Sequence, residues 1–337
     1  MNDIDWTESR VLVTGATGMV GSWLTRRLVD EGAYVVALIR DADPQSELLR
    51  SGTIERVSVV NGRLEDYESV ERAVNEHDVD TVFHLGAQTI VGTAQRSPMQ
   101  TLAANVQGTW NVLETARVHP ELVKRVVVAS SDKAYGEQPD LPYREDMPLT
   151  GRAPYEVSKS CTDLVTQSYA MTYGVPAVIA RCGNIYGGGD LNWSRIVPGT
   201  IRSLVHRQQP VIRSDGTFLR DYLYVDDVVD AYLVLARALD DPDMYGEAFN
   251  FSDESPLSVM DIYRAVCDAA GVDVEPLIQN KAVGEIKDQY LSAAKARERL
   301  GWKAGFDLRA GLERTLTWYE SLLGPVTPVT PAAPVKR

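Results

Sequence analysis

The stretch Val11-Leu12-Val13-Thr14-Gly15-Ala16-Thr17-Gly18-Met19-Val20-Gly21 contains an apolar strand, a glycine-rich turn and the beginning of a helix. The first glycine allows a tight turn, the second lets backbone N–H groups approach a phosphate, and the third lets the helix pack closely on the strand. This order of elements is typical of a fold that binds a dinucleotide through its pyrophosphate. We predict that the segment binds its cofactor with Gly15, Thr17, Gly18, Met19 and Gly21.

Apolar segments alternate with amphipathic segments through the first half of the chain. The expected strands are 11–13, 34–39, 57–60, 81–85, 125–129 and 177–180, and the expected helices are 18–31, 66–76, 98–117 and 154–173. Near-continuous apolar strands separated by amphipathic helices indicate a parallel sheet covered on both faces. The sequence therefore predicts an α/β fold with a doubly wound parallel sheet of the Rossmann type, and ligands at the carboxyl ends of its strands.

The pattern changes after residue 182, where glycines cluster and the elements become shorter. We predict a dinucleotide-binding domain over 1–182 and a smaller, mixed C-terminal substrate lobe over 183–322, from which some segments return to the first domain. The last amphipathic helix is expected at 308–322. Residues 323–337 are proline-rich and weakly hydrophobic, which predicts an extended, poorly ordered tail.

Composition narrows the class of ligand. The formal net charge is −13, whereas nucleic-acid binders usually carry basic surfaces. Three widely spaced cysteines and four histidines show no disulfide or metal-binding spacing, which fits a reducing compartment and no metal site. No apolar run approaches the roughly 20 residues that span a bilayer, and the N-terminal residues do not resemble a signal peptide. These features predict a cytoplasmic protein that binds neither nucleic acid nor membrane.

Two further segments carry catalytic side chains: Ser130-Ser131-Asp132-Lys133, and Tyr155-Glu156-Val157-Ser158-Lys159. Tyr155 and Lys159 are four residues apart and share one face of a helix. The charge of the lysine lowers the cost of a tyrosinate, so Tyr155 can remove a hydroxyl proton while a hydride leaves the same carbon. Ser131 follows an expected strand and can hydrogen-bond the same substrate oxygen. The predicted catalytic residues are Ser131, Asp132, Lys133, Tyr155 and Lys159.

The end of the second expected strand bears on the choice of nicotinamide cofactor. An acidic residue there accepts hydrogen bonds from the ribose 2′-hydroxyl of NAD, whereas an arginine suits the 2′-phosphate of NADP. This chain has both, as Arg40 and Asp41, and both could equally be solvated surface residues. The sequence favours NAD and leaves NADP open.

These motifs resemble the extended branch of the short-chain dehydrogenase/reductase superfamily, in particular its nucleotide-sugar epimerases and dehydratases. The resemblance covers the chain to about residue 319 and includes the stretches 84–88, 105–109, 181–187 and 220–227. It implies additional cofactor contacts from Leu64, Leu85, Ala87 and Asn105. It also implies a homodimer formed through the helices near 98–117 and 154–173.

The same resemblance implies that an NDP-sugar is bound by Gln88, Asn184, Arg195, Arg220 and Tyr290. A guanidinium fork suits the oxygens of a diphosphate, which favours this role for the two arginines. The alternative for Arg220 is a surface ion pair with its neighbour Asp221.

Asp132 and Lys133 separate the possible reactions. Epimerases need no acid–base pair after the serine, whereas dehydratases have one, and the Asp-Lys pair resembles CDP-glucose 4,6-dehydratases. The stretch 216–222 is more similar to dTDP- and UDP-sugar enzymes, so the nucleobase stays open. The leading hypothesis is an NDP-glucose 4,6-dehydratase that oxidises C4, eliminates water across C5 and C6, and returns hydride to C6. In it, Lys133 is either the base at C5 or a group that orients Asp132 or the sugar. The alternatives are a UDP-sugar 4-epimerase and a non-catalytic dinucleotide-binding protein.

Overall fold

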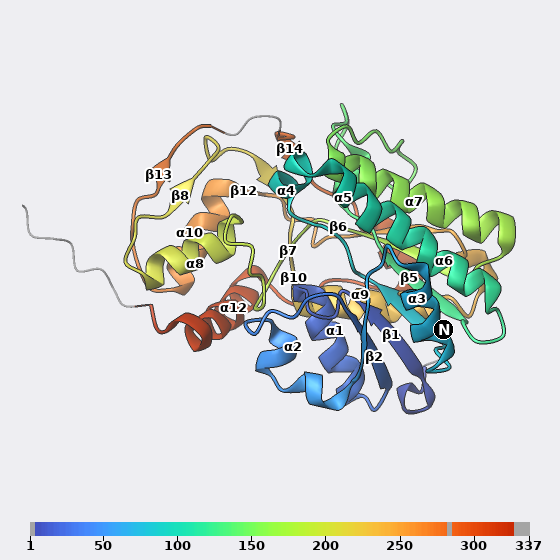
Figure 1. The fold of residues 1–337 in the computed structure, drawn as a ribbon. Helices are drawn as coiled ribbons and strands as arrows, with labels where there is room; N and C mark the ends of the chain where they lie inside the picture. The colour runs from blue at the N-terminus through green and yellow to red at the C-terminus, as the bar shows by residue number, and fades with distance from the viewer. Residues whose placement is uncertain (1–3, 282–284, 327–337) are drawn as a thin grey trace, which may run out of the picture.

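The computed structural model describes residues 4–281 and 285–326, and a seven-stranded parallel sheet forms its centre (Figure 1). The strand order is β11-β6-β5-β4-β1-β2-β3, with β1 paired in parallel to both β2 and β4. The prediction of a Rossmann-type doubly wound sheet is confirmed. The strands are β1 (Arg10–Thr14), β2 (Tyr34–Ile39), β3 (Ser58–Asn61), β4 (Thr81–His84), β5 (Arg125–Ala129), β6 (Ala177–Cys182) and β11 (Ala248–Phe251).

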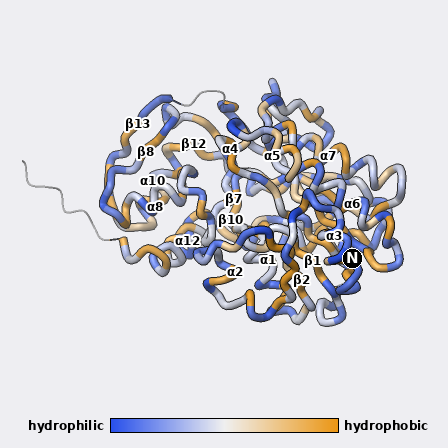
Figure 2. The backbone as a smooth tube through the Cα atoms, viewed as in Figure 1, coloured by the Kyte–Doolittle hydropathy of each residue, from blue (hydrophilic) through white to orange (hydrophobic). Residues whose placement is uncertain are grey.

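Helices cover both faces of this sheet because successive strand residues alternate between two apolar cores. In β1, Val11 and Val13 belong to the core beneath α1 (Met19–Asp30) and α9 (Val225–Ala238), whereas Leu12 belongs to the core beneath α3 (Tyr67–Asn75) and α6 (Gly108–Val118). Helix α7 (Pro154–Tyr173) packs beside α6 on the second face. In Figure 2 the central strands are among the hydrophobic segments, as a sheet buried on both sides requires.

A second lobe lies beside the carboxyl edge of the sheet. Its core includes Tyr186, Ile201, Ile262 and Tyr319, with helices α8 (Ile196–Val205), α10 (Val259–Ala269) and α12 (Leu308–Leu323) around it. Short strands pair within the lobe as β7 with β10, β12-β9-β14, and β8 with β13. Their bounds are β7 (Asn184–Tyr186), β8 (Val211–Ile212), β9 (Leu219–Arg220), β10 (Tyr222–Tyr224), β12 (Leu257–Ser258), β13 (Leu277–Ile278) and β14 (Asp288–Gln289).

The remaining elements are short connections. They are η1 (Trp6–Glu8), α2 (Glu47–Arg50), η2 (Thr53–Arg56), α4 (Val91–Arg96), α5 (Pro98–Leu102), η3 (Ala103–Gln107), η4 (Asp132–Tyr135), η5 (Pro242–Met244) and α11 (Ala294–Leu300). The helix expected over 98–117 is interrupted, because η3 is a π-helical turn between α5 and α6. Such turns are rare and often occur at functional sites.

Elements from beyond residue 182 return to the large sheet, among them α9, α11 and the edge strand β11, which pairs with β6. Residues 327–337 of the expected tail lie outside the described residues, whereas Val326 packs against the core of α8 and α10. Within the described residues, no helix is both long and apolar enough to cross a bilayer.

Candidate active site

The glycine turn has the shape of a phosphate cradle. Gly15 adopts a φ of +73°, and a Cβ there would lie 2.7 Å from the backbone nitrogen of Gly86. A Cβ at Gly21 would lie 2.1 Å from the Gly15 carbonyl oxygen, so only glycine allows α1 to approach β1 this closely. Gly18 caps α1 without any side-chain hydrogen bond, so no capping side chain satisfies the first N–H groups of the helix. These groups and the helix dipole suit an anionic pyrophosphate.

The predicted cofactor residues at the end of β2 lie beside this turn. The Thr17 hydroxyl donates to the backbone carbonyl of Asp41 at 3.4 Å. Arg40 and Asp41 form an ion pair with an N–O distance of 2.6 Å, and both side chains are exposed. The Asp41 carboxylate on this exposed edge can accept a hydrogen bond from a ribose hydroxyl. The adjacent Arg40 guanidinium partly neutralises the charge of that carboxylate.

Asn105 lies in the π-helical turn and joins the loop after β4 to helix α7. Its side-chain oxygen accepts from the backbone N–H of Gln88 at 2.6 Å, and its amide donates to the Ser158 hydroxyl at 2.8 Å. Gln88 uses its own side-chain oxygen to accept from the backbone of Ile90 at 2.9 Å. The loop after β4, which contains Leu85 and Ala87, is thereby fixed against α7. Leu64 packs on this loop, since a Cβ at Gly86 would lie 2.6 Å from it.

The start of α7 sets the position of Tyr155. Pro154 occupies the first turn, and the Glu156 carboxylate accepts from the backbone N–H of Ala153 at 3.1 Å, which closes the helix N-terminus. One turn later, the Lys159 amine donates to the Ala129 carbonyl oxygen at 2.7 Å, at the end of β5. The helix therefore presents both side chains to the carboxyl end of the sheet, as their spacing predicts.

Tyr155, Ser131 and Asp132 form one hydrogen-bonded group. The Ser131 hydroxyl donates to the Asp132 carboxylate at 2.8 Å and also contacts Tyr155. Burial raises the pKa of Tyr155 to about 12, and the positive charge of Arg195 acts against this rise. Burial also lowers the pKa of Lys159 to about 8, opposed by the carboxylate of Asp163. The protein alone therefore keeps Tyr155 protonated at neutral pH, and proton removal by this group needs further positive charge next to it.

Lys133 reaches across to the second lobe. Its amine donates to the side-chain oxygen of Gln289 in β14. Burial is the main reason that the pKa of Lys133 is lowered; Arg220 lowers it further, and Asp132 acts in the opposite direction. Burial thus favours the neutral amine, which is the form of lysine that can act as a base.

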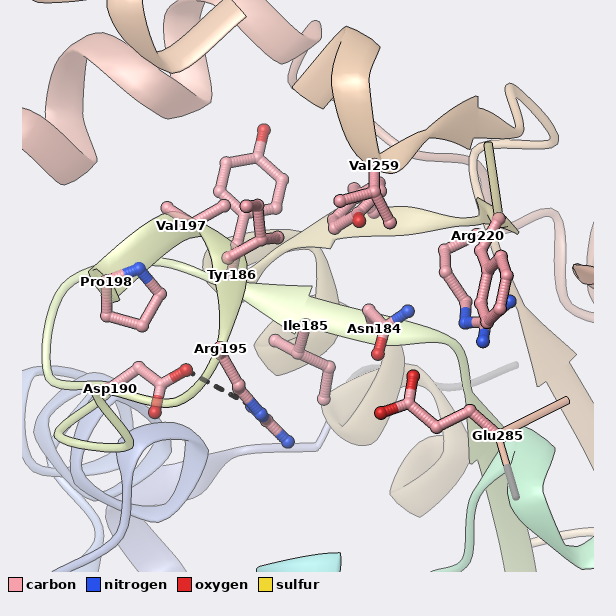
Figure 3. A pocket seen from close by; sticks show the side chains of 13 residues that line it. Asn184, Ile185, Tyr186, Asp190, Arg195, Val197, Pro198, Arg220, Val259 and Glu285 are labelled. Carbon is pink, nitrogen blue, oxygen red and sulfur yellow. Dashed lines mark hydrogen bonds and ion pairs between the residues drawn. The ribbon is translucent and has the colours of Figure 1, made fainter. Parts of the chain in front are cut away.

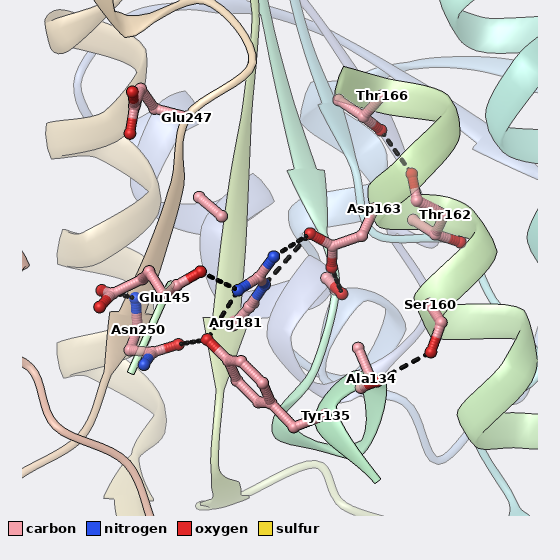
Figure 4. A network of polar contacts seen from close by, with 12 residues as sticks. Ala134, Tyr135, Glu145, Ser160, Thr162, Asp163, Thr166, Arg181, Glu247 and Asn250 are labelled. Atoms are coloured by element: carbon pink, nitrogen blue, oxygen red, sulfur yellow. Dashed lines mark hydrogen bonds and ion pairs between the residues drawn. The ribbon is translucent and has the colours of Figure 1, made fainter. Parts of the chain in front are cut away.

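A buried polar network surrounds the predicted catalytic segment 130–133 (Figure 4). The Arg181 guanidinium donates twice to the Asp163 carboxylate, at 2.7 and 3.1 Å, and once to the Tyr135 hydroxyl at 2.7 Å. Ser130, next to Ser131, donates to the other Asp163 oxygen. Buried ion pairs are costly to break because the remaining charge is left unpaired, so this network fixes the end of β5 relative to β6 and α7.

A pocket of about 160 Å³ lies in the second lobe, and all the residues that line it fall within 184–285 (Figure 3). Its polar walls include Asn184, Arg195, Arg220 and Glu285, and Arg195 forms an ion pair with Asp190 at 3.2 Å. Its apolar walls come from Ile185, Tyr186, Ile196, Val197, Pro198, Phe218, Tyr222 and Val259. Cationic groups within an apolar wall suit a ligand with phosphates and a planar base.

Arg220 is buried and does not form the surface ion pair considered from the sequence. Three of its N–H groups donate to the backbone carbonyls of Leu219, Ile286 and Lys287. A guanidinium has five such donors, so two remain for a ligand. The Asp221 carboxylate instead accepts from the backbone N–H of Leu291 at 2.6 Å, and burial raises its pKa to about 7.

The predicted residue Tyr290 lies outside the set that lines this pocket. Its backbone carbonyl accepts from the N–H of Tyr143 at 2.9 Å, and its side chain is half-buried. Sequence reasoning missed Gln289 and Glu285, which lie on the same segment. Neither belongs to a motif; their only signal was the nearby tyrosine.

A nicotinamide dinucleotide fits these residues, because the cradle excludes side chains and the helix N-terminus has no side-chain cap. Residues 11–250 match the model of the NAD dependent epimerase/dehydratase family, and the chain belongs to this family. It is an enzyme family of nucleotide-sugar dehydratases and epimerases, and the prediction of NAD as cofactor is confirmed.

Individual relatives carry both activities. The chain is 31% identical to the CDP-glucose 4,6-dehydratase of Salmonella typhimurium, with 94% of this chain and 92% of the relative covered. It is 30% identical to the UDP-glucose 4-epimerase of Mycolicibacterium smegmatis, with 93% and 99% covered. A crystal structure of the UDP-glucose 4-epimerase of Thermotoga maritima with UDP-glucose superposes with a TM-score of 0.84 at 27% identity, covering 93% and 99% of the two chains. Overall similarity therefore does not distinguish elimination from epimerisation.

Proposed function

We propose that this protein is an NDP-hexose 4,6-dehydratase, a lyase that converts an NDP-glucose to an NDP-4-keto-6-deoxyhexose. The observation that carries the proposal is the position of Asp132 and Lys133, which follow directly on Ser131 and share its site with Tyr155. Epimerisation at C4 needs no acid and base at these two places, whereas elimination of water across C5 and C6 needs both. The Salmonella relative is named as a CDP-glucose 4,6-dehydratase. On this similarity we propose that the substrate resembles CDP-glucose.

The reaction begins when Tyr155, as a tyrosinate, takes the proton of the C4 hydroxyl, which Ser131 orients. Lys159 and the oxidised nicotinamide would supply the positive charge that the tyrosinate needs. NAD, when bound, supplies the hydride acceptor for C4 and the hydride donor for C6. The C4 ketone acidifies the C5 hydrogen, which Lys133 removes as a proton. Asp132 delivers a proton to the departing C6 hydroxyl, so water leaves and a C5–C6 double bond forms. Reduction at C6 and return of the proton to C5 complete the product, and the net change is the loss of one water.

We also propose which residues hold the two ligands. Gly15, Gly18 and Gly21 receive the pyrophosphate with Thr17 and Met19, and Asp41 beside Arg40 faces the adenosine ribose. Leu64, Leu85, Ala87 and Asn105 line the cofactor side, and Tyr155 and Lys159 reach its nicotinamide ribose. The sugar nucleotide lies in the pocket, with Asn184, Arg195 and Arg220 around its diphosphate and Gln88 and Tyr290 near the sugar. The pocket, the exposed cradle and the charges described above support this arrangement.

The second candidate is a UDP-sugar 4-epimerase, favoured by the epimerase relatives. Incubation with CDP-, dTDP- and UDP-glucose followed by NMR of the products separates the two. A 4-keto-6-deoxy sugar supports the dehydratase, and a galactose product would replace it with the epimerase. Unchanged sugars would exclude both activities on these three substrates and would favour a non-catalytic dinucleotide-binding protein.

Arg220→Gln should weaken binding of the sugar nucleotide by about 1.5–3 kcal/mol, the usual contribution of a hydrogen bond to a charged group. Calorimetric titration of the NAD-loaded protein with the accepted NDP-glucose measures the change. Arg213→Gln is the matched control, because this arginine is exposed on the same lobe and lies outside the pocket. Equal affinities for the Arg220 variant and the wild type would remove Arg220 from the diphosphate site.

We further propose a homodimer that pairs α5, α6 and α7 with the same helices of a second copy. Large apolar side chains are exposed along these helices, namely Met99, Leu102, Trp110, Leu164 and Met171. Met171→Asp should therefore shift the mass measured by light scattering from two chains to one. A wild-type mass of one chain would exclude the dimer.

The three cysteines are free, which supports a reducing, cytoplasmic location.

A further inference from the structure

The buried side chain of Gln289 contacts the amine of Lys133. It lies on β14, which pairs in parallel with β9 so that Gln289 is opposite Arg220. Its side chain is fully buried, and its amide oxygen accepts the hydrogen bond from the Lys133 amine. This contact joins the second lobe to the segment that follows β5.

The other end of the same amide is not satisfied. Within residues 4–281 and 285–326, the Gln289 Nε2 atom is buried and has no hydrogen-bond partner. A buried polar group in this state is destabilising, and native structures contain few of them. Within the described residues, the bond from Lys133 is therefore the one side-chain hydrogen bond of Gln289.

The charges around Lys133 show what that contact does. Asp132 on η4, Glu156 on α7 and Glu285 before β14 favour the charged amine, whereas Arg220 on β9 disfavours it. The nearest acceptor to the amine is the uncharged amide of Gln289. A carboxylate in that position would complete an ion pair and hold the amine as an ammonium ion.

We propose that Gln289 is a positioning residue for Lys133, which holds the amine through a neutral acceptor and thereby leaves it able to take the C5 proton. The second part of this inference rests on the proposed dehydratase reaction. The first part, that a neutral partner at position 289 controls the charge of Lys133, does not depend on which reaction the enzyme catalyses.

Gln289→Glu changes the charge of the acceptor with almost no change in size. Competitive acetylation of the NAD-loaded protein with acetic anhydride across pH, read by peptide mass spectrometry, gives the pH at which half of Lys133 is reactive. Exposed Lys303 serves as the internal reference. The midpoint for Lys133 should rise by about 1–3 pH units in this variant, the usual effect of an opposite charge at contact distance. Gln208→Glu places the same charge on an exposed site of the same lobe and should leave the midpoint unchanged.

Gln289→Leu removes the acceptor without adding charge. We expect solvent deuterium exchange at C5 to slow by about 10²-fold at every pH, because the amine loses its fixed position. In Gln289→Glu the exchange should instead recover its full rate at a correspondingly higher pH. C4 oxidation should stay near the wild-type rate in both variants.

The two readouts separate two failures. An unchanged Lys133 midpoint in Gln289→Glu, or wild-type exchange in Gln289→Leu, would overturn the role of Gln289 even in an active dehydratase. A raised midpoint in an enzyme that shows no C5 exchange would instead support the contact and overturn the dehydratase.

Discussion

Tyr155→Phe should lower turnover by about 10²–10⁴-fold, the usual range for the loss of an acid–base group. The phenylalanine ring fills the same buried space, since the hydroxyl is the only group removed. Binding of NAD and of the sugar nucleotide should therefore stay close to that of the wild type. Steady-state rates and calorimetric titrations of the same preparation measure both quantities.

The control for this change is Tyr173→Phe on the exposed end of the same helix. It removes a hydroxyl from α7 without touching Ser131, so its turnover should equal that of the wild type. Normal turnover in Tyr155→Phe would refute the role of Tyr155 in proton transfer. A loss of affinity for NAD or the sugar nucleotide that equals the loss of turnover would show that Tyr155 acts in ligand binding.

Asp132→Asn should stop the reaction after C4 oxidation and lower dehydration by about 10²–10⁴-fold. The amide keeps the acceptor for the Ser131 hydroxyl, which lies 2.8 Å from Asp132, but it cannot deliver a proton to the departing C6 hydroxyl. Mass spectrometry of quenched single turnovers should show a 4-keto-hexose nucleotide that retains its C6 hydroxyl.

Asp146→Asn, an exposed carboxylate beyond the catalytic segment, is the control for loss of charge. It should form the dehydrated product at the wild-type rate. If Asp132→Asn also dehydrates at that rate, the proton for the C6 hydroxyl comes from another group. Asp132 would then no longer distinguish elimination of water from epimerisation.

The sequence predicted the large sheet well because its signals are local. Each strand of the first half is a short apolar run. Each glycine of the cradle stands where a Cβ would come too close to the neighbouring backbone. The prediction that Tyr155 and Lys159 share one face of a helix required only the helical repeat. The motifs and the helical period therefore predicted which segments meet at the carboxyl end of the sheet.

The rest depends on contacts between distant segments. Gln289 meets Lys133 across more than 150 residues of sequence, and β11 joins the sheet although α9 and the second lobe intervene. The π-helical turn at Asn105 has no propensity signal, since the same residues are compatible with an ordinary helix. Such features are determined by packing between lobes and not by the residues next to them.

If Asp132 and Lys133 eliminate water after C4 oxidation, as we propose, solvent deuterium is incorporated into the product. Wild-type enzyme with NAD is incubated in D₂O with the NDP-glucose it accepts, and the product is analysed by NMR. We expect an NDP-4-keto-6-deoxyhexose with deuterium at C5, because that carbon loses and regains a proton. A product that is simply the C4 epimer, with hydrogen retained at C5, would contradict it.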